Sequence, residues 1–170
     1  MKYLNSMFTR SATVFLATTL LLTNAQALPL GQPAPEFELR GDSASTVKLS
    51  ALRGKVVYLD FWASWCGPCR QSFPWMNDLQ AKYASRGLQI VGVNLDAKDA
   101  DARKFLAETQ ANFLLAFDSK GVTPKLYGVK GMPTSYLIDR EGRIVSEHPG
   151  FHFSKTATLE KEIEKLLESK

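Results

Sequence analysis

Residues 55–69 read Lys-Val-Val-Tyr-Leu-Asp-Phe-Trp-Ala-Ser-Trp-Cys-Gly-Pro-Cys and hold the only two cysteines of the chain, Cys66 and Cys69. The stretch 55–61 is a nearly continuous apolar run, which predicts a strand buried on both faces of a sheet. From residue 67 onward the apolar residues follow helical spacing. Two thiols at a junction of strand and helix favour a disulfide that opens and closes, because so short a loop would contribute little stability as a structural bridge.

The N-terminal segment has the pattern of a secretory signal peptide. Lys2 and Arg10 are its charged residues, an apolar stretch follows them, and an Ala-Gln-Ala sequence ends at residue 27. We therefore expect residues 1–27 to be removed and residues 28–170 to form one domain in the periplasm, with no stable membrane insertion. The alternative is an uncleaved membrane anchor, but an apolar stretch of about 13 residues is short for a hydrocarbon core of roughly 30 Å.

Composition and charge exclude some classes of function. The chain has 170 residues, 45% hydrophobic and 22% charged, which suffices for one domain with a hydrophobic core. The formal net charge of +4 falls to +2 without Lys2 and Arg10, because 19 basic residues then face 17 acidic ones. No basic run exceeds two residues. This pattern gives no indication of nucleic-acid binding.

Strands alternate with helices along the rest of the sequence. Strands are expected at 37–39, 47–49, 55–61, 88–95, 114–117, 134–138 and 143–148. Helices are expected at 67–85, 100–109, 122–127 and 155–168. This order predicts a three-layer α/β/α domain with a mixed central sheet and an N-terminal hairpin extension.

The position of the cysteine pair indicates how it would react. Cys66 lies where a helix begins, and there the helix dipole and free backbone N–H groups stabilise a thiolate. Pro68 suits the first helical turn, where a missing N–H costs nothing. We therefore expect Cys66 to be the exposed nucleophile with a low pKa, and Cys69 to be the shielded resolving thiol. The pair itself would be the redox centre, with no other cofactor.

The stretch 57–69 closely resembles the active-site strand of thioredoxins. Phe73-Pro74 lies where that family's active-site helix carries its kinking proline, and residues 131–144 resemble its cis-proline loop and hairpin. The opening at 31–37, together with the signal peptide, is similar to the exported TlpA/ResA-like branch. The resemblance extends over residues 29–170 and implies the thioredoxin fold.

The resemblance implies a substrate groove beside the cysteines. It implies a cis peptide bond before Pro133 and a backbone at Met132 that pairs with an extended substrate chain. Trp62 and Phe73 would add apolar surface around the cysteines, with Trp62 packing rather than contacting substrate. The other residues expected at the groove are Trp65, Gly67 and Pro68.

Asp60 interrupts the apolar strand, where a charge is costly to bury. The resemblance implies a buried carboxylate that takes the proton of Cys69 through water; the alternative is a carboxylate that reaches solvent at the strand end. Thioredoxins often pair this carboxylate with a lysine, but the matching position here is Gly92, so the pKa of Asp60 should rise further. The ResA-like branch can place a glutamate after the next strand, for which Asp96 is a weak substitute.

His148 and His152 suggest a metal site only superficially. Two histidines at this spacing need a helix to face the same side, and Pro149-Gly150 between them excludes one. No metal is therefore predicted.

The Gly-Pro pair between the cysteines resembles that of the reducing thioredoxins. The hypothesis is a periplasmic reductant of disulfides in exported client proteins, with electrons from a membrane DsbD-like or CcdA-like donor. Cytochrome c maturation and copper-site assembly are the client classes that the resemblance implies. Two alternatives stay open: a redoxin-type thiol peroxidase, although its Pro-x-x-x-Thr-x-x-Cys pattern is missing before Cys66, and a non-catalytic binding or chaperone module.

Overall fold

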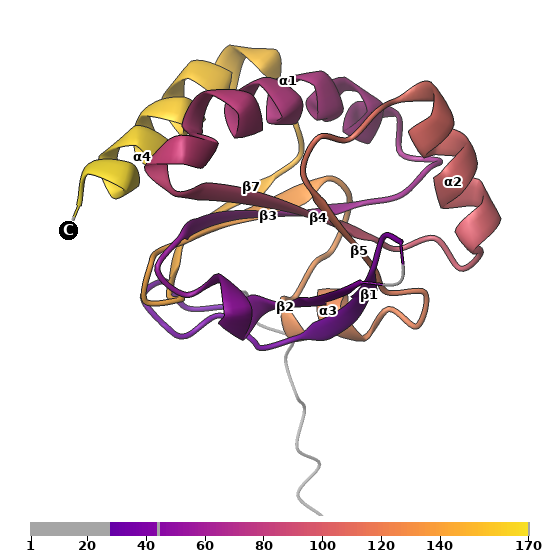
Figure 1. Ribbon diagram of the computed structural model, residues 1–170, viewed down its shortest axis with the longest axis horizontal. Coiled ribbons are helices and arrows are strands. Elements are labelled where there is room, and N and C mark those ends of the chain that lie inside the picture. Colours follow the sequence, from indigo (N-terminus) through magenta and orange to yellow (C-terminus); the bar gives the residue numbers. More distant parts are fainter. Residues whose placement is uncertain (1–27, 44, 170) are drawn as a thin grey trace, which may run out of the picture.

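The computed structural model describes residues 28–43 and 45–169, so the predicted signal peptide at 1–27 lies outside the described residues (Figure 1). The strands are β1 (Glu38–Gly41), β2 (Thr46–Lys48), β3 (Val56–Trp62), β4 (Leu88–Asn94), β5 (Leu114–Phe117), β6 (Thr134–Ile138) and β7 (Ile144–Pro149). The helices are α1 (Gly67–Tyr83), α2 (Asp99–Glu108), α3 (Val122–Leu126) and α4 (Thr156–Glu168). Single 3-10 turns cover Leu49–Leu52, Ala84–Arg86 and Phe153–Lys155.

The strands form one mixed sheet in the order β2-β1-β5-β4-β3-β6-β7. β3 lies inside it, parallel to β4 and antiparallel to β6. Helices α1, α2 and α4 lie on one side of the sheet, and α3 lies on the opposite side (Figure 1). The predicted mixed α/β architecture is confirmed.

Both faces of β3 are buried, as its apolar run predicts. Tyr58 and Trp62 belong to the apolar cluster under the helices α1, α2 and α4, whereas Leu59 and Phe61 belong to the cluster on the opposite face. This alternation follows from the two-residue period of a strand. Asp60 lies between Tyr58 and Trp62 in that period, so its side chain faces α1 rather than solvent.

The N-terminal hairpin is confirmed but is more than an extension. β1 and β2 pair antiparallel, and β1 also pairs with β5 through Arg40 and Phe117. The hairpin therefore completes one edge of the central sheet. In the part of the chain that the structure describes, no helix combines the length and apolar character needed to cross a membrane.

The helix predicted at 67–85 ends slightly earlier than expected. α1 stops at Tyr83, a 3-10 turn follows, and Gly87 takes a left-handed conformation with φ of 100° before β4. Pro74 lies inside α1, as the resemblance implies. The helix packs through a stripe of buried residues that includes Phe73, Met76 and Leu79, which fixes the direction of its first turn against the sheet.

Candidate active site

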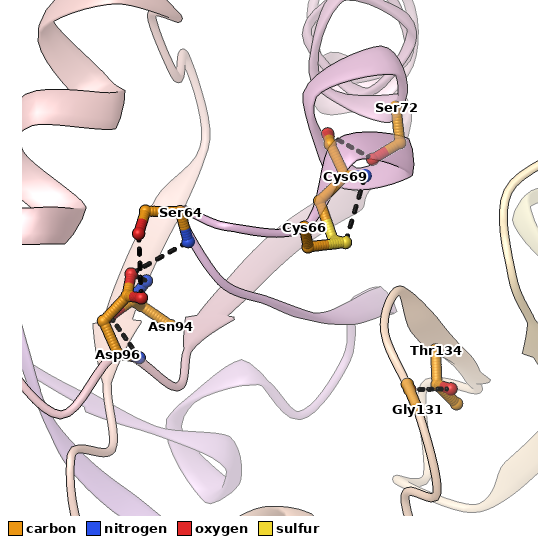
Figure 2. The surroundings of a disulfide bond; sticks show 8 residues. All are labelled: Ser64, Cys66, Cys69, Ser72, Asn94, Asp96, Gly131 and Thr134. Atoms are coloured by element: carbon orange, nitrogen blue, oxygen red, sulfur yellow. Dashed lines mark hydrogen bonds between the residues drawn. A yellow bond between two sulfur atoms is a disulfide. The ribbon is translucent and has the colours of Figure 1, made fainter.

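Cys66 and Cys69 form a disulfide at the N-terminus of α1 (Figure 2). Cys66 is the N-cap residue, and its Sγ accepts a hydrogen bond of 3.2 Å from the backbone N–H of Cys69. Pro68 follows in the first turn, where no intrahelical donor is lost. The strand end and the helix start therefore meet at the sulfur atom of Cys66.

The expected exposure of Cys66 is wrong for the disulfide form. The exposed fraction is 5% for Cys66 and 0% for Cys69, because both belong to the apolar cluster beneath α1. Their order is as predicted, with Cys69 the deeper of the two. The residues exposed around the pair are Trp65, Gly67 and Pro68, and the side chain of Trp65 is 73% exposed.

Trp62 and Phe73 lie below this surface rather than on it. Both are fully buried, and their ring centroids are 4.9 Å apart. Phe105 of α2 completes the aromatic group at 4.9 Å from each. Trp62 packs, as predicted, but the expectation that these two rings line a groove is wrong, because α2 covers them.

The peptide bond between Met132 and Pro133 is cis, as predicted. The loop is held at both ends, since Thr134 Oγ1 donates to Gly131 O at 2.7 Å and the N–H of Gly150 donates to Pro133 O at 2.8 Å. Met132 packs against the cluster that contains both cysteines. A hollow of about 390 Å³ lies between this loop and the end of β7. The cis-proline loop therefore lies against the same apolar cluster as the two cysteines.

Asp60 is buried, with an exposed fraction of 2%, which contradicts the alternative that it reaches solvent. Its strand neighbours are Gly92 on β4 and Ser135 on β6, so the position opposite Asp60 carries no cation on β4. Its Oδ2 has no hydrogen-bond partner among the residues that the structure describes. Burial raises the pKa of Asp60 well above its usual range.

The Asp96 carboxylate does not take the place of a glutamate near the cysteines. It accepts hydrogen bonds from the loop that precedes them (Figure 2). Its carboxylate accepts hydrogen bonds from Ser64 N at 3.0 Å, Ser64 Oγ at 2.9 Å and Asn94 Nδ2 at 2.7 Å. Sequence reasoning missed Ser64 and Asn94. The polar residues at the end of β4, which lies beside the end of β3, were the sequence feature that could have identified them.

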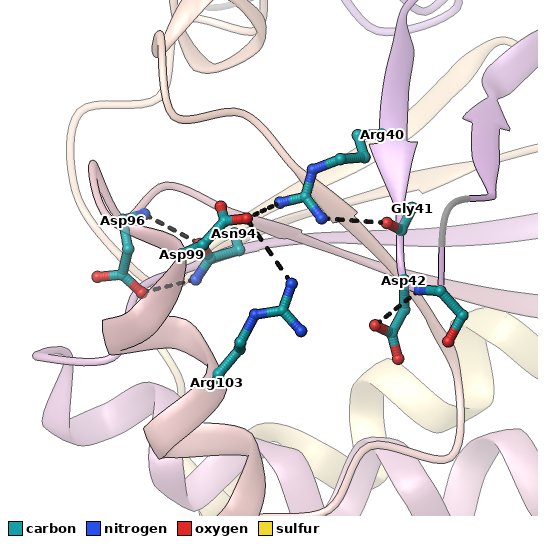
Figure 3. Close-up of polar contacts among 8 residues, drawn as sticks. Arg40, Gly41, Asp42, Asn94, Asp96, Asp99 and Arg103 are labelled. Carbon is teal, nitrogen blue, oxygen red and sulfur yellow. Dashed lines mark hydrogen bonds and ion pairs between the residues drawn. The ribbon is translucent and has the colours of Figure 1, made fainter.

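Helix α2 is tied to its surroundings by charged contacts on both sides. Asp99 at its first turn receives Arg40 of β1 at 2.6 Å and lies 3.9 Å from Arg103 (Figure 3). Arg70 of α1 donates to Glu108 at 3.1 Å at the other end of α2. These half-exposed pairs hold α2 over the aromatic group, although each is weak by itself.

His148 lies in β7, and His152 follows that strand. Within residues 28–43 and 45–169 no three His, Cys, Asp or Glu side chains are grouped to hold a metal ion. His148 Nε2 instead lies 2.9 Å from Ser146 Oγ and 3.2 Å from Glu162 Oε2.

Comparisons with known proteins agree with this geometry. Residues 30–147 match the AhpC/TSA family. Two proteins named thiol-disulfide oxidoreductase ResA are similar: that of Bacillus thuringiensis subsp. konkukian is 34% identical over 75% of this chain and 74% of its own, and that of Oceanobacillus iheyensis is 38% identical over 79% and 72%. A crystal structure from Chlorobium tepidum, described as a candidate thiol:disulfide interchange protein DsbE, is 60% identical, with a TM-score of 0.81 over 83% of this chain and 99% of its own. The fold is thus thioredoxin-like, and the chain belongs to the AhpC/TSA family as a thiol-disulfide oxidoreductase of the ResA and DsbE type.

Proposed function

We propose that this thiol-disulfide oxidoreductase reduces disulfides in exported client proteins, with Cys66 as nucleophile and Cys69 as resolving thiol. The observation that carries the proposal is the hydrogen bond from Cys69 N to Cys66 Sγ at the start of α1. After reduction, the same N–H and the helix dipole would stabilise a thiolate at Cys66. Cys69 has no exposure and can react only with a sulfur already bound to Cys66.

The exchange proceeds in two displacements. The Cys66 thiolate attacks one sulfur of the client disulfide, forms a mixed disulfide and releases the other client sulfur as a thiolate. Cys69 then loses its proton and attacks Cys66 Sγ, which closes the Cys66–Cys69 disulfide and releases the second client thiolate. The client gains two electrons and the cysteine pair loses two.

Asp60 is the proposed acceptor of the Cys69 proton. Burial raises its pKa, which brings it closer to that of a thiol and makes proton transfer between the two groups easier. Because Gly92 faces Asp60 across the strands, no lysine at that position fixes the carboxylate in its charged form. The transfer would pass through water, as the resemblance to thioredoxins implies.

The client would bind across the exposed surface around the pair. Trp65, Gly67 and Pro68 supply this surface on one side of the disulfide, and the backbone of Met132 before Pro133 supplies edge groups on the other. An extended client segment would add to this backbone like a further strand. No metal and no other cofactor takes part in the proposed reaction.

Export is supported by the signal-peptide pattern of residues 1–27. In the periplasm the reduced form would be regenerated by a membrane DsbD-like or CcdA-like donor. Cytochrome c maturation and copper-site assembly are the proposed client classes, because both need thiols kept reduced in an oxidising compartment.

Trapping of mixed disulfides tests the assignment. A Cys69→Ala variant expressed in cells should accumulate covalent complexes with both client and donor, which mass spectrometry identifies. The matched control is Cys66→Ser alone, which keeps Cys69 and should trap no client. Complexes that persist in the control would contradict Cys66 as nucleophile.

The direction of exchange is tested by equilibrating the purified protein with glutathione. A reductant of the thioredoxin kind should show a potential near about −270 mV, and a value above about −150 mV would contradict the reductase assignment. Rapid consumption of peroxide by the isolated protein would favour the peroxidase alternative instead.

A further inference from the structure

A second cavity lies behind the redox site, between β7 and α4. It measures about 440 Å³. Tyr58 of β3 and Ser135 of β6 line it although both are buried, so they form its floor. The charged and titratable residues that line it are Glu147, His148, His152, Lys155 and Glu162. The cavity therefore connects a polar mouth with the two residues that lie beside Asp60 on β3 and β6.

Asp60 is closed toward β4. Opposite it stands Gly92, where an added Cβ would lie 3.0 Å from the ring of Phe113 and 3.1 Å from Trp62 Nε1. These aromatic rings fill the space that a longer side chain would need. Within residues 28–43 and 45–169, Trp62 Nε1 also has no hydrogen-bond partner. No charged side chain can therefore reach Asp60 from the position of Gly92 without moving the aromatic group.

Toward β6, the neighbour of Asp60 is a residue with a hydroxyl group. Ser135 is its direct partner in the antiparallel register, and side chains so paired have Cβ atoms about 4.5–5.5 Å apart. Ser135 is in turn the direct partner of His148 on β7. Asp60, Ser135 and His148 thus form one row across three strands, and the last two line the cavity.

The titratable groups around this row do not compete with Asp60 as acceptors. Burial, followed by the charge of Asp60, raises the pKa of Tyr58 more than its hydrogen bond with Ser135 lowers it, so its hydroxyl stays neutral. Gly92 contributes no group from β4, and α1 contributes Cys69. At the mouth, His148 Nε2 is held by Ser146 Oγ and by Glu162 Oε2 of α4.

We propose that Ser135 is the proton exit of Asp60, leading to water in the cavity between β7 and α4. The proposal rests on the proposed role of Asp60 in accepting the Cys69 proton. The Ser135 oxygen accepts the proton of the Asp60 carboxyl while the hydroxyl donates its own hydrogen to water in the cavity, and no electrons move. Rotation of the hydroxyl restores the starting state. Ser135 acts through Asp60, and His148 with Glu162 positions the acceptor at the mouth.

A physical need supports this route. The Cys66–Cys69 disulfide, with exposed fractions of 5% and 0%, closes the site on the client side once exchange is complete. Asp60 must nevertheless lose its proton before the next cycle. The β6 side offers a hydroxyl and a cavity, whereas the β4 side offers only a glycine and aromatic rings.

Two matched variants test the route. Ser135→Thr keeps the hydroxyl, and Ser135→Val has the shape of threonine without the hydroxyl. The reduced protein is mixed in stopped flow with excess 5,5′-dithiobis(2-nitrobenzoate). The first release of chromophore reports attack by Cys66, and the second reports attack by Cys69. Burial favours a protonated Asp60 in the reduced protein, so this carboxyl must lose its proton before it can accept that of Cys69. We therefore expect Ser135→Val to slow the second release about tenfold or more at neutral pH, because a positioned proton-transfer group contributes about 10²–10⁴ to rate. The first release should be unchanged in both, and Ser135→Thr should stay within about threefold of wild type in the second.

Three further results separate the possible failures. Tyr58→Phe should leave both releases unchanged; if it slows the second release and Ser135→Val does not, the exit runs through Tyr58 and the proposal is overturned. If Asp60→Asn slows the second release but the two Ser135 variants release the second chromophore at equal rates, the proposed proton exit is wrong and the proposed role of Asp60 is retained. If Asp60→Asn has no effect, the proposed role of Asp60 fails first. A normal first release in each variant shows that the site has folded.

Discussion

Removal of the Asp96 carboxylate should loosen the loop that carries the cysteines. In Asp96→Ala three donors lose their acceptor: Ser64 N, Ser64 Oγ and Asn94 Nδ2. Ser64 is half-buried and its two donors can turn to water, whereas Asn94 is buried. A hydrogen bond to a charged group contributes about 1.5–3 kcal/mol, and a stranded buried donor costs about 1–3 kcal/mol. We therefore expect a loss of about 3 kcal/mol in the free energy of unfolding.

Urea unfolding of the oxidised protein measures this loss, and thermal unfolding should show a fall of about 6–12 °C. Asp96→Asn is the control. Its amide oxygen can accept from Ser64 N and Asn94 Nδ2, while its NH₂ group donates to Ser64 Oγ, so only the charge is lost and the cost should be about 1 kcal/mol. A loss below about 1 kcal/mol in the free energy of unfolding of Asp96→Ala, or equal losses for both variants, would refute the conclusion that the Asp96 hydrogen bonds stabilise this loop.

Three further predictions concern single residues. Burial raises the folded-state pKa of Asp60 above its unfolded value of about 3.9, so the contribution of this carboxyl to stability is complete below about pH 3.9 and is lost as pH rises toward the folded pKa. The free energy of unfolding of the wild type should therefore fall by up to about 1.4 kcal/mol per pH unit relative to that of Asp60→Asn. Urea unfolding between about pH 4 and 8 measures the difference between the two proteins, and a constant difference would contradict the raised pKa. Gly92→Ala should cost about 1–3 kcal/mol in urea unfolding, because its Cβ would lie 3.0 Å from Phe113, and a neutral result would show that the ring moves freely. Arg140→Ala removes a donor 3.0 Å from Leu167 O, so hydrogen exchange in the last turn of α4 should accelerate about fivefold, while exchange in α1 stays constant.

The sequence predicted the centre of the fold because the information there is local. The apolar run of β3, the cysteine pair and the first turn of α1 are contiguous, and their periods identify strand and helix without tertiary context. The cis bond before Pro133 was predicted only through the resemblance, since composition alone favours an ordinary turn.

The rest of the site depends on register, which the sequence does not contain. Ser64 and Asp96 are 32 positions apart and meet only because β3 and β4 end side by side. The low exposure of Cys66 likewise depends on packing beneath α1. The position of Cys66 at a helix start therefore predicts a larger exposed fraction than the structure has. The cavity behind Asp60 requires the positions of β7 and α4, which no local pattern fixes.

The glycine opposite Asp60 and the serine beside it have connected physical consequences. A buried carboxylate without a cation is costly to ionise, so Gly92 favours a protonated Asp60 between cycles. A proton held there must be exchanged with solvent for the site to work again, and Ser135 is the hydroxyl placed between Asp60 and the cavity. A lysine at position 92 would hold Asp60 in its charged form and would also displace the rings of Trp62 and Phe113. The glycine at position 92 and the proposed exit toward β6 therefore belong together: burial without a cation raises the pKa of the carboxylate, and the proposed route lets its proton leave on the β6 side.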